Sequence, residues 1–265
     1  MSISTKLLLR KWRPQLGLLS IFLLAFSVQA NLDTELNSSA LHSKNQIKTI
    51  VLINPNSNIQ ATESMAALAQ LEVGEQVLVE GRSNSNAPSL LTTPKDMHAA
   101  AAGVVELGVA AAADKNVSAL IVSAFSDPGL AELRSKITIP VFGIGEAVFH
   151  EAAKGGRAFG IVTVTPDEQL LASFRQKAEE LGYGGQYRGA RVTPGDPLEL
   201  VASAEQLDVA LATAVRESIE EDSAQAVIMG GGPLSASAIR LQPQFDVPLL
   251  VAVNAAARAA LDSIK

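Results

Sequence analysis

The stretch Thr49-Ile-Val-Leu-Ile-Asn-Pro-Asn-Ser-Asn58 decides the fold class of this chain of 265 residues. Its first half, Thr49 to Ile53, is an unbroken run of β-branched and aliphatic residues, which is typical of a strand buried on both faces. Asn, Pro and Ser then form a turn, and a helical pattern runs through Thr62 to Leu71. This order of strand, turn and helix predicts an α/β protein with a parallel sheet.

The same unit recurs along the chain, with a long irregular loop expected from Gly81 to Thr93. The predicted strands are Thr49–Ile53, Gln76–Glu80, Ala119–Ser123, Pro140–Gly143, Phe159–Val164, Tyr187–Val192, Ala226–Met229 and Pro248–Val251. After the first helix, one predicted helix begins near Thr93 or Pro94 and ends near Asp114. The other predicted helices span Glu146–Lys154, Pro166–Leu181, Pro197–Glu221 and Ser235–Leu241. Each half of the chain therefore offers about four strands, and we expect ligand-binding residues in the loops that follow them.

The composition excludes several classes of protein. Aromatic residues make up only 4% of the chain, so its core must consist of aliphatic side chains. A net charge of −6 without a basic stripe in the folded part argues against nucleic-acid binding. The chain contains no cysteine, and its His, Asp and Glu residues lack metal-ligand spacing, so we predict no metal site.

The N-terminus has the pattern of a secretory signal peptide. Four basic residues precede an uncharged apolar run from Leu16 to Val28, and Val28-Gln-Ala30 offers a cleavage site after Ala30. The run is shorter than the ~20 residues of a membrane-spanning helix, although an uncleaved anchor is the alternative. We expect a signal peptide over residues 1–30, a flexible linker over 31–46, a periplasmic or secreted protein, and no stable membrane anchor after cleavage.

Four ordered segments carry a resemblance to a known family: Ile50-Val-Leu-Ile-Asn-Pro-Asn-Ser57, Ala124-Phe-Ser-Asp-Pro-Gly-Leu130, Val141-Phe-Gly-Ile-Gly-Glu-Ala147 and Gly230-Gly-Gly-Pro-Leu234. From about Ile47 to Arg258 the chain resembles the aspartate/glutamate/hydantoin racemase superfamily, especially its hydantoin and allantoin racemase branch. The resemblance implies two flavodoxin-like α/β lobes related by a pseudo-twofold axis, with a ligand cleft between them. The first lobe would span residues 47–145 and be completed by 250–265, and the second would span 146–249.

The resemblance also implies a mechanism that this chain cannot perform. In the racemases, one cysteine from each lobe faces each side of the carbon that loses and regains a proton. The two thiol positions fall on Ala124 and Gly231, whose side chains cannot accept a proton. Among their neighbours in sequence only Ser123 carries a hydroxyl, which is a far weaker base than a thiolate. We therefore exclude the two-thiol mechanism.

The remaining motif residues can still bind the family's type of ligand through amides and hydroxyls at strand-to-helix turns. Ordinary capping and turn chemistry is the alternative explanation for the same residues. The candidate substrate-binding residues are Asn54, Asn56, Ser57, Thr163, Thr165, Gly231 and Gly232.

Few residues are available as replacement acid–base groups. Asp127 and Ser126 lie in the first thiol-bearing loop, and Glu146 lies in the Gly-Ile-Gly-Glu turn. For Asp127 before Pro128, a turn or cap role is favoured over catalysis, whereas for Glu146 a helix cap and a catalytic role are equal alternatives. His98 and His150, on predicted helices, are better explained as structural or solvent-facing residues.

Two functions follow from these observations. The first is a cofactor-independent, isomerase-like enzyme that acts next to the carboxylate or carbonyl of an amino acid, hydantoin or related small molecule. The second is a catalytically inactive periplasmic protein that binds or senses a small carboxylate or ureide, a role that the signal peptide and the missing thiols favour. The expected partner is a small molecule in both cases, and a homo-oligomer is possible.

Overall fold

The computed structural model describes residues 47–89, 91, 94–231 and 234–265. The predicted signal peptide, the predicted linker, Thr93 and the candidate Gly232 lie outside the described residues. Residues 47–265 form one compact unit. None of the helices described in this unit is long and apolar enough to cross a membrane.

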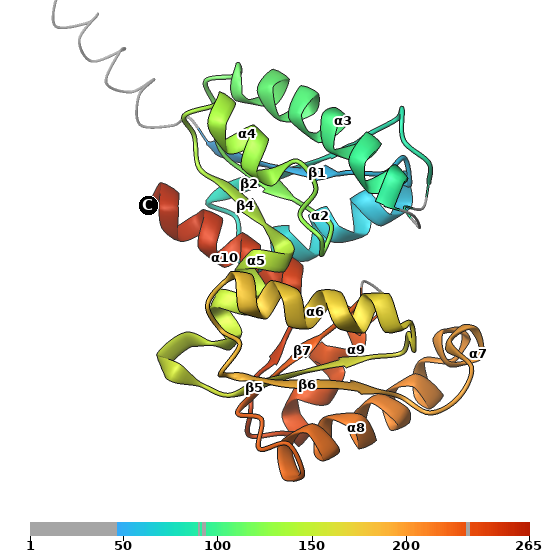
Figure 1. The fold of residues 1–265 in the computed structure, drawn as a ribbon. Coiled ribbons are helices and arrows are strands. Elements are labelled where there is room, and N and C mark those ends of the chain that lie inside the picture. The colour runs from blue at the N-terminus through green and yellow to red at the C-terminus, as the bar shows by residue number, and fades with distance from the viewer. Residues whose placement is uncertain (1–46, 90, 92–93, 232–233) are drawn as a thin grey trace, which may run out of the picture. The chain divides into compact units, whose positions relative to one another are not determined.

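Two parallel sheets of four strands form the centres of two lobes (Figure 1). The first has the order β2-β1-β3-β4 and comprises β1 (Lys48–Asn54), β2 (Val77–Ser83), β3 (Val117–Val122) and β4 (Val141–Gly143). The second has the order β6-β5-β7-β8 and comprises β5 (Phe159–Thr163), β6 (Tyr187–Val192), β7 (Ala226–Met229) and β8 (Leu249–Leu250). Each lobe places its strands in the same relative order, as expected for two flavodoxin-like lobes.

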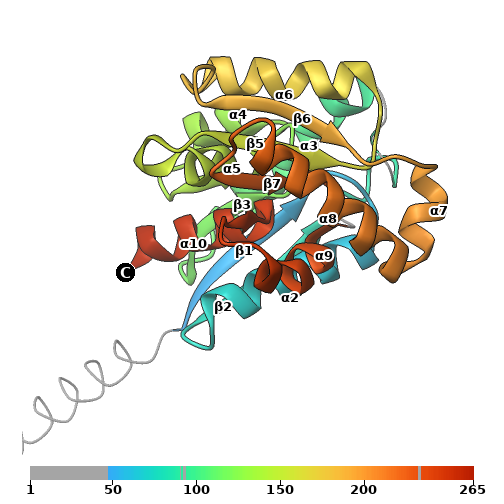
Figure 2. The same cartoon turned by 90° about the horizontal axis from the view of Figure 1, so that it is seen from below.

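Helices cover both faces of each sheet. In the first lobe, α3 (Pro94–Ala112) and α4 (Leu130–Lys136) pack on one face, while α2 (Ile59–Val73) and the C-terminal α10 (Ala252–Ile264) pack on the other. In the second lobe, α8 (Ala204–Glu220) and α9 (Leu234–Leu241) lie side by side on one face (Figure 2). The other face packs against α5 (Ile144–Ala152) and α6 (Glu168–Glu180). The short α7 (Pro197–Ala202) precedes α8, and single 3₁₀ turns follow α5 and α9.

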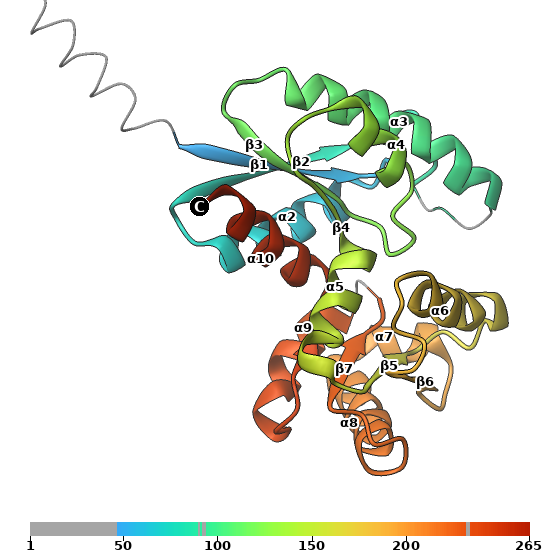
Figure 3. The ribbon, with the colours of Figure 1, turned by 60° about the vertical axis from the view of Figure 1, so that its left-hand side comes forward.

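The central core runs from one lobe into the other. In β1, Ile50 and Leu52 face this central core, whereas Val51 and Ile53 face the core under α3 and α4. All four side chains are fully buried, as the unbroken apolar run predicts. Figure 3 shows α5 where the lobes meet, and α5 contacts α10, β4 and β7. The lobes therefore share one continuous hydrophobic interior.

The structure corrects several predicted boundaries. The helix predicted over Pro197–Glu221 is interrupted at Ser203, which adopts an extended conformation and accepts a hydrogen bond from the Gln206 N–H at 3.4 Å as the cap of α8. Strand β2 continues to Ser83, into the predicted loop. Helix α5 begins at Ile144, so Glu146 lies inside its first turn. Helix α4, which begins after a left-handed Gly129, was not predicted.

Candidate functional site

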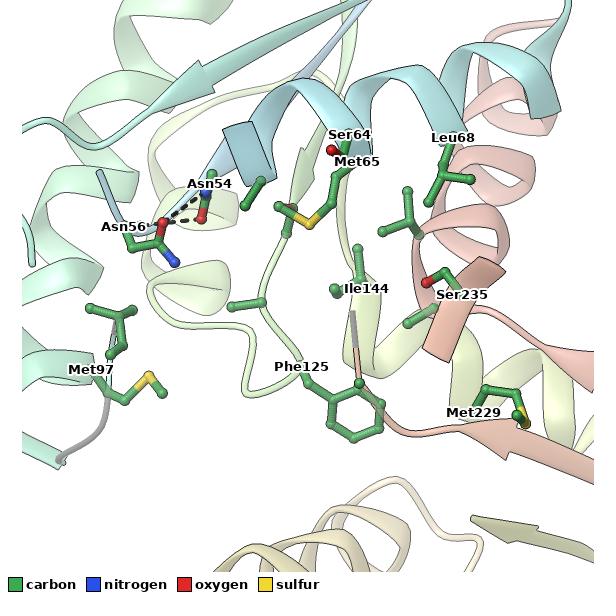
Figure 4. Close-up of a pocket in the computed structure, with 17 residues that line it drawn as sticks. Asn54, Asn56, Ser64, Met65, Leu68, Met97, Phe125, Ile144, Met229 and Ser235 are labelled. Atoms are coloured by element: carbon green, nitrogen blue, oxygen red, sulfur yellow. Dashed lines mark hydrogen bonds between the residues drawn. The ribbon is translucent and has the colours of Figure 1, made fainter. Parts of the chain in front are cut away.

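A pocket of about 560 Å³ lies between the two lobes, at the carboxyl ends of strands from both sheets (Figure 4). Its position is where parallel α/β sheets usually bind ligands, and its volume suits a small organic molecule. The lining residues are Asn54, Asn56, Ala61, Ser64, Met65, Leu68, Leu91, Met97, Ser123, Ala124, Phe125, Ile144, Met229, Gly231, Ser235, Ala252 and Val253.

Much of the wall is apolar and deformable. Helix α2 contributes Met65 and Leu68, the loop after β3 contributes Phe125, and β7 contributes Met229 (Figure 4). The chain has four methionines, and the three beyond Met1 all line this pocket. Flexible thioether side chains adapt to apolar groups of different shapes. This wall therefore suits an apolar substituent rather than a charged one.

One corner of the pocket is polar and is organised by Asn54, which is only 1% exposed at the end of β1. Its amide nitrogen donates to Asn56 Oδ1 at 2.8 Å and to Thr62 Oγ1 at 2.9 Å, and its oxygen accepts the Asn56 N–H at 3.2 Å. These bonds use both the donor and acceptor ends of the carboxamide. Asn54 consequently fixes the turn between β1 and α2.

Asn56 is the residue that this turn presents to a ligand. Its Oδ1 accepts from Asn54 Nδ2 and from the Asn58 N–H at 2.9 Å, so two donors fix which end of the amide is oxygen. Its Nδ2 has no hydrogen-bond partner among the described residues and points away from Asn54 (Figure 4). Asn56 thereby offers an oriented donor for a carbonyl or carboxylate oxygen.

Ala124 and Gly231, the two positions at which the sequence resemblance predicts thiols, both line this pocket, one from each lobe. Ala124 follows β3, and Gly231 follows β7 with a φ of 155°. Beside Ala124, the buried Ser123 donates its hydroxyl to Met65 Sδ at 3.0 Å. A thioether is a weak acceptor and not a base, so nothing in this contact activates the hydroxyl as a nucleophile.

Asp127 lies behind the pocket wall. Its carboxylate accepts the N–H groups of Gly145 at 2.9 Å and Glu146 at 2.7 Å, and it forms an ion pair with Lys177. Burial raises the pKa of Asp127 above its ordinary value, against the opposing effect of Lys177 and the backbone N–H groups. The structure thus gives Asp127 a full set of structural partners, and it is not among the residues that line the pocket.

Glu146 and Ser126 are also outside the pocket lining. Glu146 accepts two hydrogen bonds from Arg134, at 2.9 and 3.1 Å, in a separate depression beside α10. Burial acts to raise the pKa of Glu146, but Arg134 and His150 hold it below its ordinary value. The Ser126 hydroxyl donates to Met97 Sδ at 3.4 Å.

The other candidates are placed as follows. Ser57 donates its backbone N–H to the Pro88 carbonyl at 3.2 Å. Thr163 is fully buried, and its hydroxyl accepts the Thr165 N–H at 3.2 Å, as a local turn does. His98 is exposed on α3, and His150 pairs with the Tyr183 hydroxyl at 2.7 Å. Of the residues predicted to bind substrate, the structure therefore brings Asn54, Asn56 and Gly231 to the pocket.

Sequence reasoning missed the helical wall. Ala61, Ser64, Met65 and Leu68 lie on one face of α2, at the spacing of three and four residues that helical geometry requires. This spacing was visible in the sequence once the helix after Asn58 had been assigned. Ser235 at the start of α9 and Ile144 at the start of α5 needed the arrangement of the two lobes.

The chemistry available in this pocket is hydrogen bonding and apolar contact. Its described lining contains amides and hydroxyls but no Asp, Glu, His, Lys, Arg, Tyr or Cys. Across the residues that the structure describes, no group of three or more His, Asp or Glu side chains is arranged to hold a metal ion. The arrangement can orient a small molecule, and the described part of the wall contains no ionisable acid or base.

Known proteins share both the sequence pattern and the fold. The model of the family described as Asp/Glu/Hydantoin racemase matches residues 50–260. The chain is 27% identical to hydantoin racemase of Paenarthrobacter aurescens over 214 residues, which cover 80% of this chain and 89% of that protein. It is 24% identical to hydantoin racemase of Pseudomonas sp. (strain NS671) over 206 residues, covering 78% and 82% of the two chains.

Two solved structures extend the comparison. Allantoin racemase from Klebsiella pneumoniae superimposes with a TM-score of 0.72 at 25% identity, covering 81% of this chain and 86% of that one. Unliganded arylmalonate decarboxylase superimposes with a TM-score of 0.58 at 15% identity, covering 82% and 93% of the two chains, and shares the fold.

Proposed function

Because the chain belongs to the Asp/Glu/hydantoin racemase family, we propose that it binds a small amide, imide or ureide compound with an apolar substituent. The ligand occupies the pocket between the two lobes and is not racemised by a pair of thiols. The observation that carries this proposal is the absence of any ionisable side chain from the described lining of that pocket. Proton transfer at carbon needs a positioned acid and base, whereas binding needs only shape and hydrogen bonds.

The polar corner and the apolar wall define the ligand class. The free amide N–H groups of Asn56 suit a carbonyl oxygen. The Ser64 hydroxyl donates to the Gln60 carbonyl at 2.8 Å and can accept from a ligand, whereas the Ser235 hydroxyl can donate or accept. The apolar substituent lies against Met65, Leu68 and Met229. A free amino acid would lose the hydration of two charges without gaining an opposite charge in the described lining, so the pocket disfavours it.

A binding screen tests the ligand class. Purified protein is titrated calorimetrically with 5-benzylhydantoin, unsubstituted hydantoin, allantoin and aspartate. We expect the benzyl compound to bind most tightly, because it alone presents an imide at one end and a large apolar group at the other. Equal or tighter binding of aspartate would overturn the proposed ligand class.

A variant pair ties binding to the pocket. Asn56→Leu removes the oriented donor and is expected to weaken 5-benzylhydantoin binding roughly 5- to 30-fold, the range for losing one hydrogen bond in a buried site. Asn116→Leu is the matched control, because Asn116 is exposed in the turn between α3 and β3. An Asn56→Leu protein that binds like the control would place the ligand elsewhere.

Isomerisation is the second candidate function, and the similarity to hydantoin racemase of Paenarthrobacter aurescens across 89% of that protein favours it. The enzyme would act, without a cofactor, next to the carboxylate or carbonyl of an amino acid or its derivative. Incubation of L- and D-5-benzylhydantoin, aspartate, glutamate and allantoin in deuterated water distinguishes the candidates. Enzyme-dependent deuteration or loss of optical rotation establishes catalysis, and binding without either leaves the binding function.

We also propose export to the periplasm, based on the basic residues and apolar run before Ala30. Expression of the full chain with a C-terminal tag, followed by cell fractionation and mass spectrometry, tests this location. The expected product is periplasmic and begins at Asn31. A product that retains residues 1–30 and stays with the membrane would show an uncleaved anchor instead.

A further inference from the structure

A buried ion pair joins the two lobes directly behind the pocket wall. Asp127 lies in the loop between β3 and α4 of the first lobe, and Lys177 lies on α6 of the second. The Asp127 side chain is 5% exposed and that of Lys177 is 17% exposed. A pair this buried is screened little by solvent, so its two partners constrain each other's positions strongly.

Asp127 also holds the start of α5. Its two carboxylate oxygens accept the N–H groups of Gly145 and Glu146, which are among the unpaired donors of the first helical turn. The positive end of the helix dipole reinforces these bonds. The backbone of Asp127 has a φ of 53°, a left-handed conformation that non-glycine residues seldom adopt. The surrounding contacts thus hold Asp127 in an unfavourable backbone conformation.

The loop that carries Asp127 fits tightly against that helix start. A Cβ added at Gly145 would lie 2.0 Å from the Phe125 carbonyl oxygen, and one added at Gly143 would lie 2.3 Å from Asp127 Oδ1. Only glycine permits this approach. The loop and the first turn of α5 are therefore in direct backbone contact.

The same face of α6 makes a second contact with this loop. Phe174 precedes Lys177 by three residues, so the two side chains share one face of the helix. The rings of Phe125 and Phe174 meet edge to face with centroids 5.3 Å apart. Hence α6 holds the loop through an aromatic contact and an ion pair.

Three pocket residues belong to the segments that this cluster fixes. Ala124 and Phe125 lie in the loop, and Ile144 begins α5. We propose that the Lys177–Asp127 ion pair is a latch between the lobes, which ties the loop after β3 to α6 and so positions the Ala124–Phe125 segment in the pocket wall. Asp127 and Lys177 are positioning residues under this proposal, since neither lines the pocket.

Stability alone does not account for the pair. Burying two charges costs desolvation energy, and well-packed apolar residues in the same space are often at least as stabilising. A positioning role accounts for a charged pair at this place, because an ion pair fixes the relative geometry of Asp127 and Lys177 whereas apolar packing tolerates sliding. The inference rests partly on the proposed function, since it concerns the wall of the same pocket, but its first test needs no ligand.

The absence of native cysteine makes a direct test possible. Ala124→Cys introduces the only thiol of the chain, at the pocket wall. Its rate of reaction with N-ethylmaleimide, a neutral reagent, reports how firmly the Ala124–Phe125 segment is held, because Ala124 is only partly exposed in the wall. This reporter is combined with Lys177→Met, with Lys177→Arg to restore the charge, and with Arg240→Met as the matched control. Arg240→Met also removes one positive charge from an ion pair, but that pair, with Asp208, lies on the surface of the second lobe.

We expect Lys177→Met to raise the labelling rate by at least about tenfold, Lys177→Arg to restore most of the protection, and Arg240→Met to leave the rate unchanged. Rates are compared only among variants whose circular dichroism shows a folded protein. If Lys177→Met does not fold, Lys177→Gln takes its place under the same criteria. Equal labelling rates in the reporter protein with and without the Lys177 substitution would overturn the latch.

Binding of 5-benzylhydantoin separates this inference from the proposed function. Weaker binding in the Lys177→Met protein, together with faster labelling, supports both. Faster labelling in a protein that binds none of the tested compounds supports the latch and rejects the proposed ligand. Unchanged labelling with intact binding rejects the latch and leaves the proposed function standing.

Discussion

At the scale of single residues, the pocket has Ala124 and Gly231 at the two positions where the family resemblance predicts thiols. Both line the same pocket from the loops that follow β3 and β7. Neither residue has a side chain that can accept or donate a proton. Introducing a cysteine at each position tests whether the pocket can align two thiols for proton transfer.

We predict that the double variant Ala124→Cys, Gly231→Cys exchanges the ring C–H proton of 5-benzylhydantoin with solvent. A positioned acid and base typically contribute roughly 10² to 10⁴ in rate, and we expect the low end because Gly231 has a φ of 155° that a side chain strains. Deuterium incorporation followed by NMR measures the exchange. Each single variant is the control and should lack inversion. A double variant that binds the compound but exchanges no faster than either single variant would show that the site is not aligned for proton transfer.

Glycine 145 allows a second prediction at this scale. Gly145→Ala places a methyl group against the Phe125 carbonyl oxygen, a backbone atom that cannot rotate away, so we expect a loss of about 2 kcal/mol in unfolding free energy. Gly185→Ala is the control, since nothing lies within 4 Å of its added Cβ, and its effect should stay within about 0.5 kcal/mol. Urea unfolding measures both. A Gly145→Ala protein as stable as the control would show that the loop is free to shift away from α5.

The sequence predicted correctly that Asn54 and Asn56 lie at the pocket, but it did not predict that the Asp127 side chain points away from it. Asn54 and Asn56 follow a recognisable strand and turn, so their position at a strand's carboxyl end was predictable. Asp127 also follows a strand, yet its carboxylate turns toward α5 and Lys177. That direction depends on its left-handed backbone and on a helix 50 residues away, neither of which local sequence encodes.

At the scale of elements, caps decide where helices begin and hence which side chains meet the pocket. Asp167 caps α6 by accepting the Leu170 N–H at 2.7 Å, and α6 presents Phe174 and Lys177 to the loop after β3. The strand and helix alternation was predictable from apolar runs and Pro positions. The break at Ser203 was not, because a serine within an Ala-rich helical pattern can either remain in the helix or cap a new one.

The cap of α6 gives a prediction at this scale. Asp167→Ala leaves the Leu170 N–H without its partner and removes a negative charge from the helix start, so the unfolding free energy should fall by about 1 kcal/mol. Asp167→Asn keeps an acceptor oxygen and should recover most of that loss. Thermal unfolding of the three proteins measures the difference. Equal stability of Asp167→Ala and the parent protein would show that tertiary packing alone holds the first turn.

The contact between α6 and the loop should also depend on pH. Burial raises the folded-state pKa of Asp127 above 3.8, and Lys177→Met removes the cation that opposes this shift. A carboxyl group whose pKa is raised in the folded state contributes stability at low pH, and this contribution to the unfolding free energy is lost as the pH rises through that pKa. The loss of unfolding free energy caused by Lys177→Met, relative to the parent, should therefore be largest near neutral pH and should shrink as the pH falls toward about 4.

Urea unfolding at several pH values checks this trend. The double variant Lys177→Met, Asp127→Asn is the control, because it has no carboxyl group left to titrate at this place. The difference in unfolding free energy between the double variant and the parent should therefore change with pH only through the titration of Asp127 in the parent. A single variant whose cost stays constant from neutral to acidic pH would show that Asp127 is not the group coupled to Lys177.

At the scale of the whole molecule, the chain's last helix binds the lobes together. Helix α10 follows β8 of the second sheet, yet it packs against α2, β3 and β4 of the first lobe and against α5. Arg258 on α10 forms ion pairs with Glu72 on α2 and Glu151 on α5. The buried face of α10 consists of Ala252, Val253, Ala255, Ala256, Ala257, Ala260 and Ile264. Small side chains on this face let the helix approach the sheet closely.

Because α10 follows the second sheet but packs on the first lobe, we predict that the first lobe does not fold without α10. A protein that stops at Val251 keeps every strand of both sheets but exposes the apolar residues that α10 covers, including Ile50, Leu52 and Ile121 in the same core. We expect it to lose cooperative urea unfolding and to bind a hydrophobic dye, as incompletely packed proteins do. Arg258→Met is the control, because it keeps α10 and removes only its partly exposed ion pairs, so it should unfold cooperatively. A truncated protein with a sharp unfolding transition would show instead that each lobe is complete without α10.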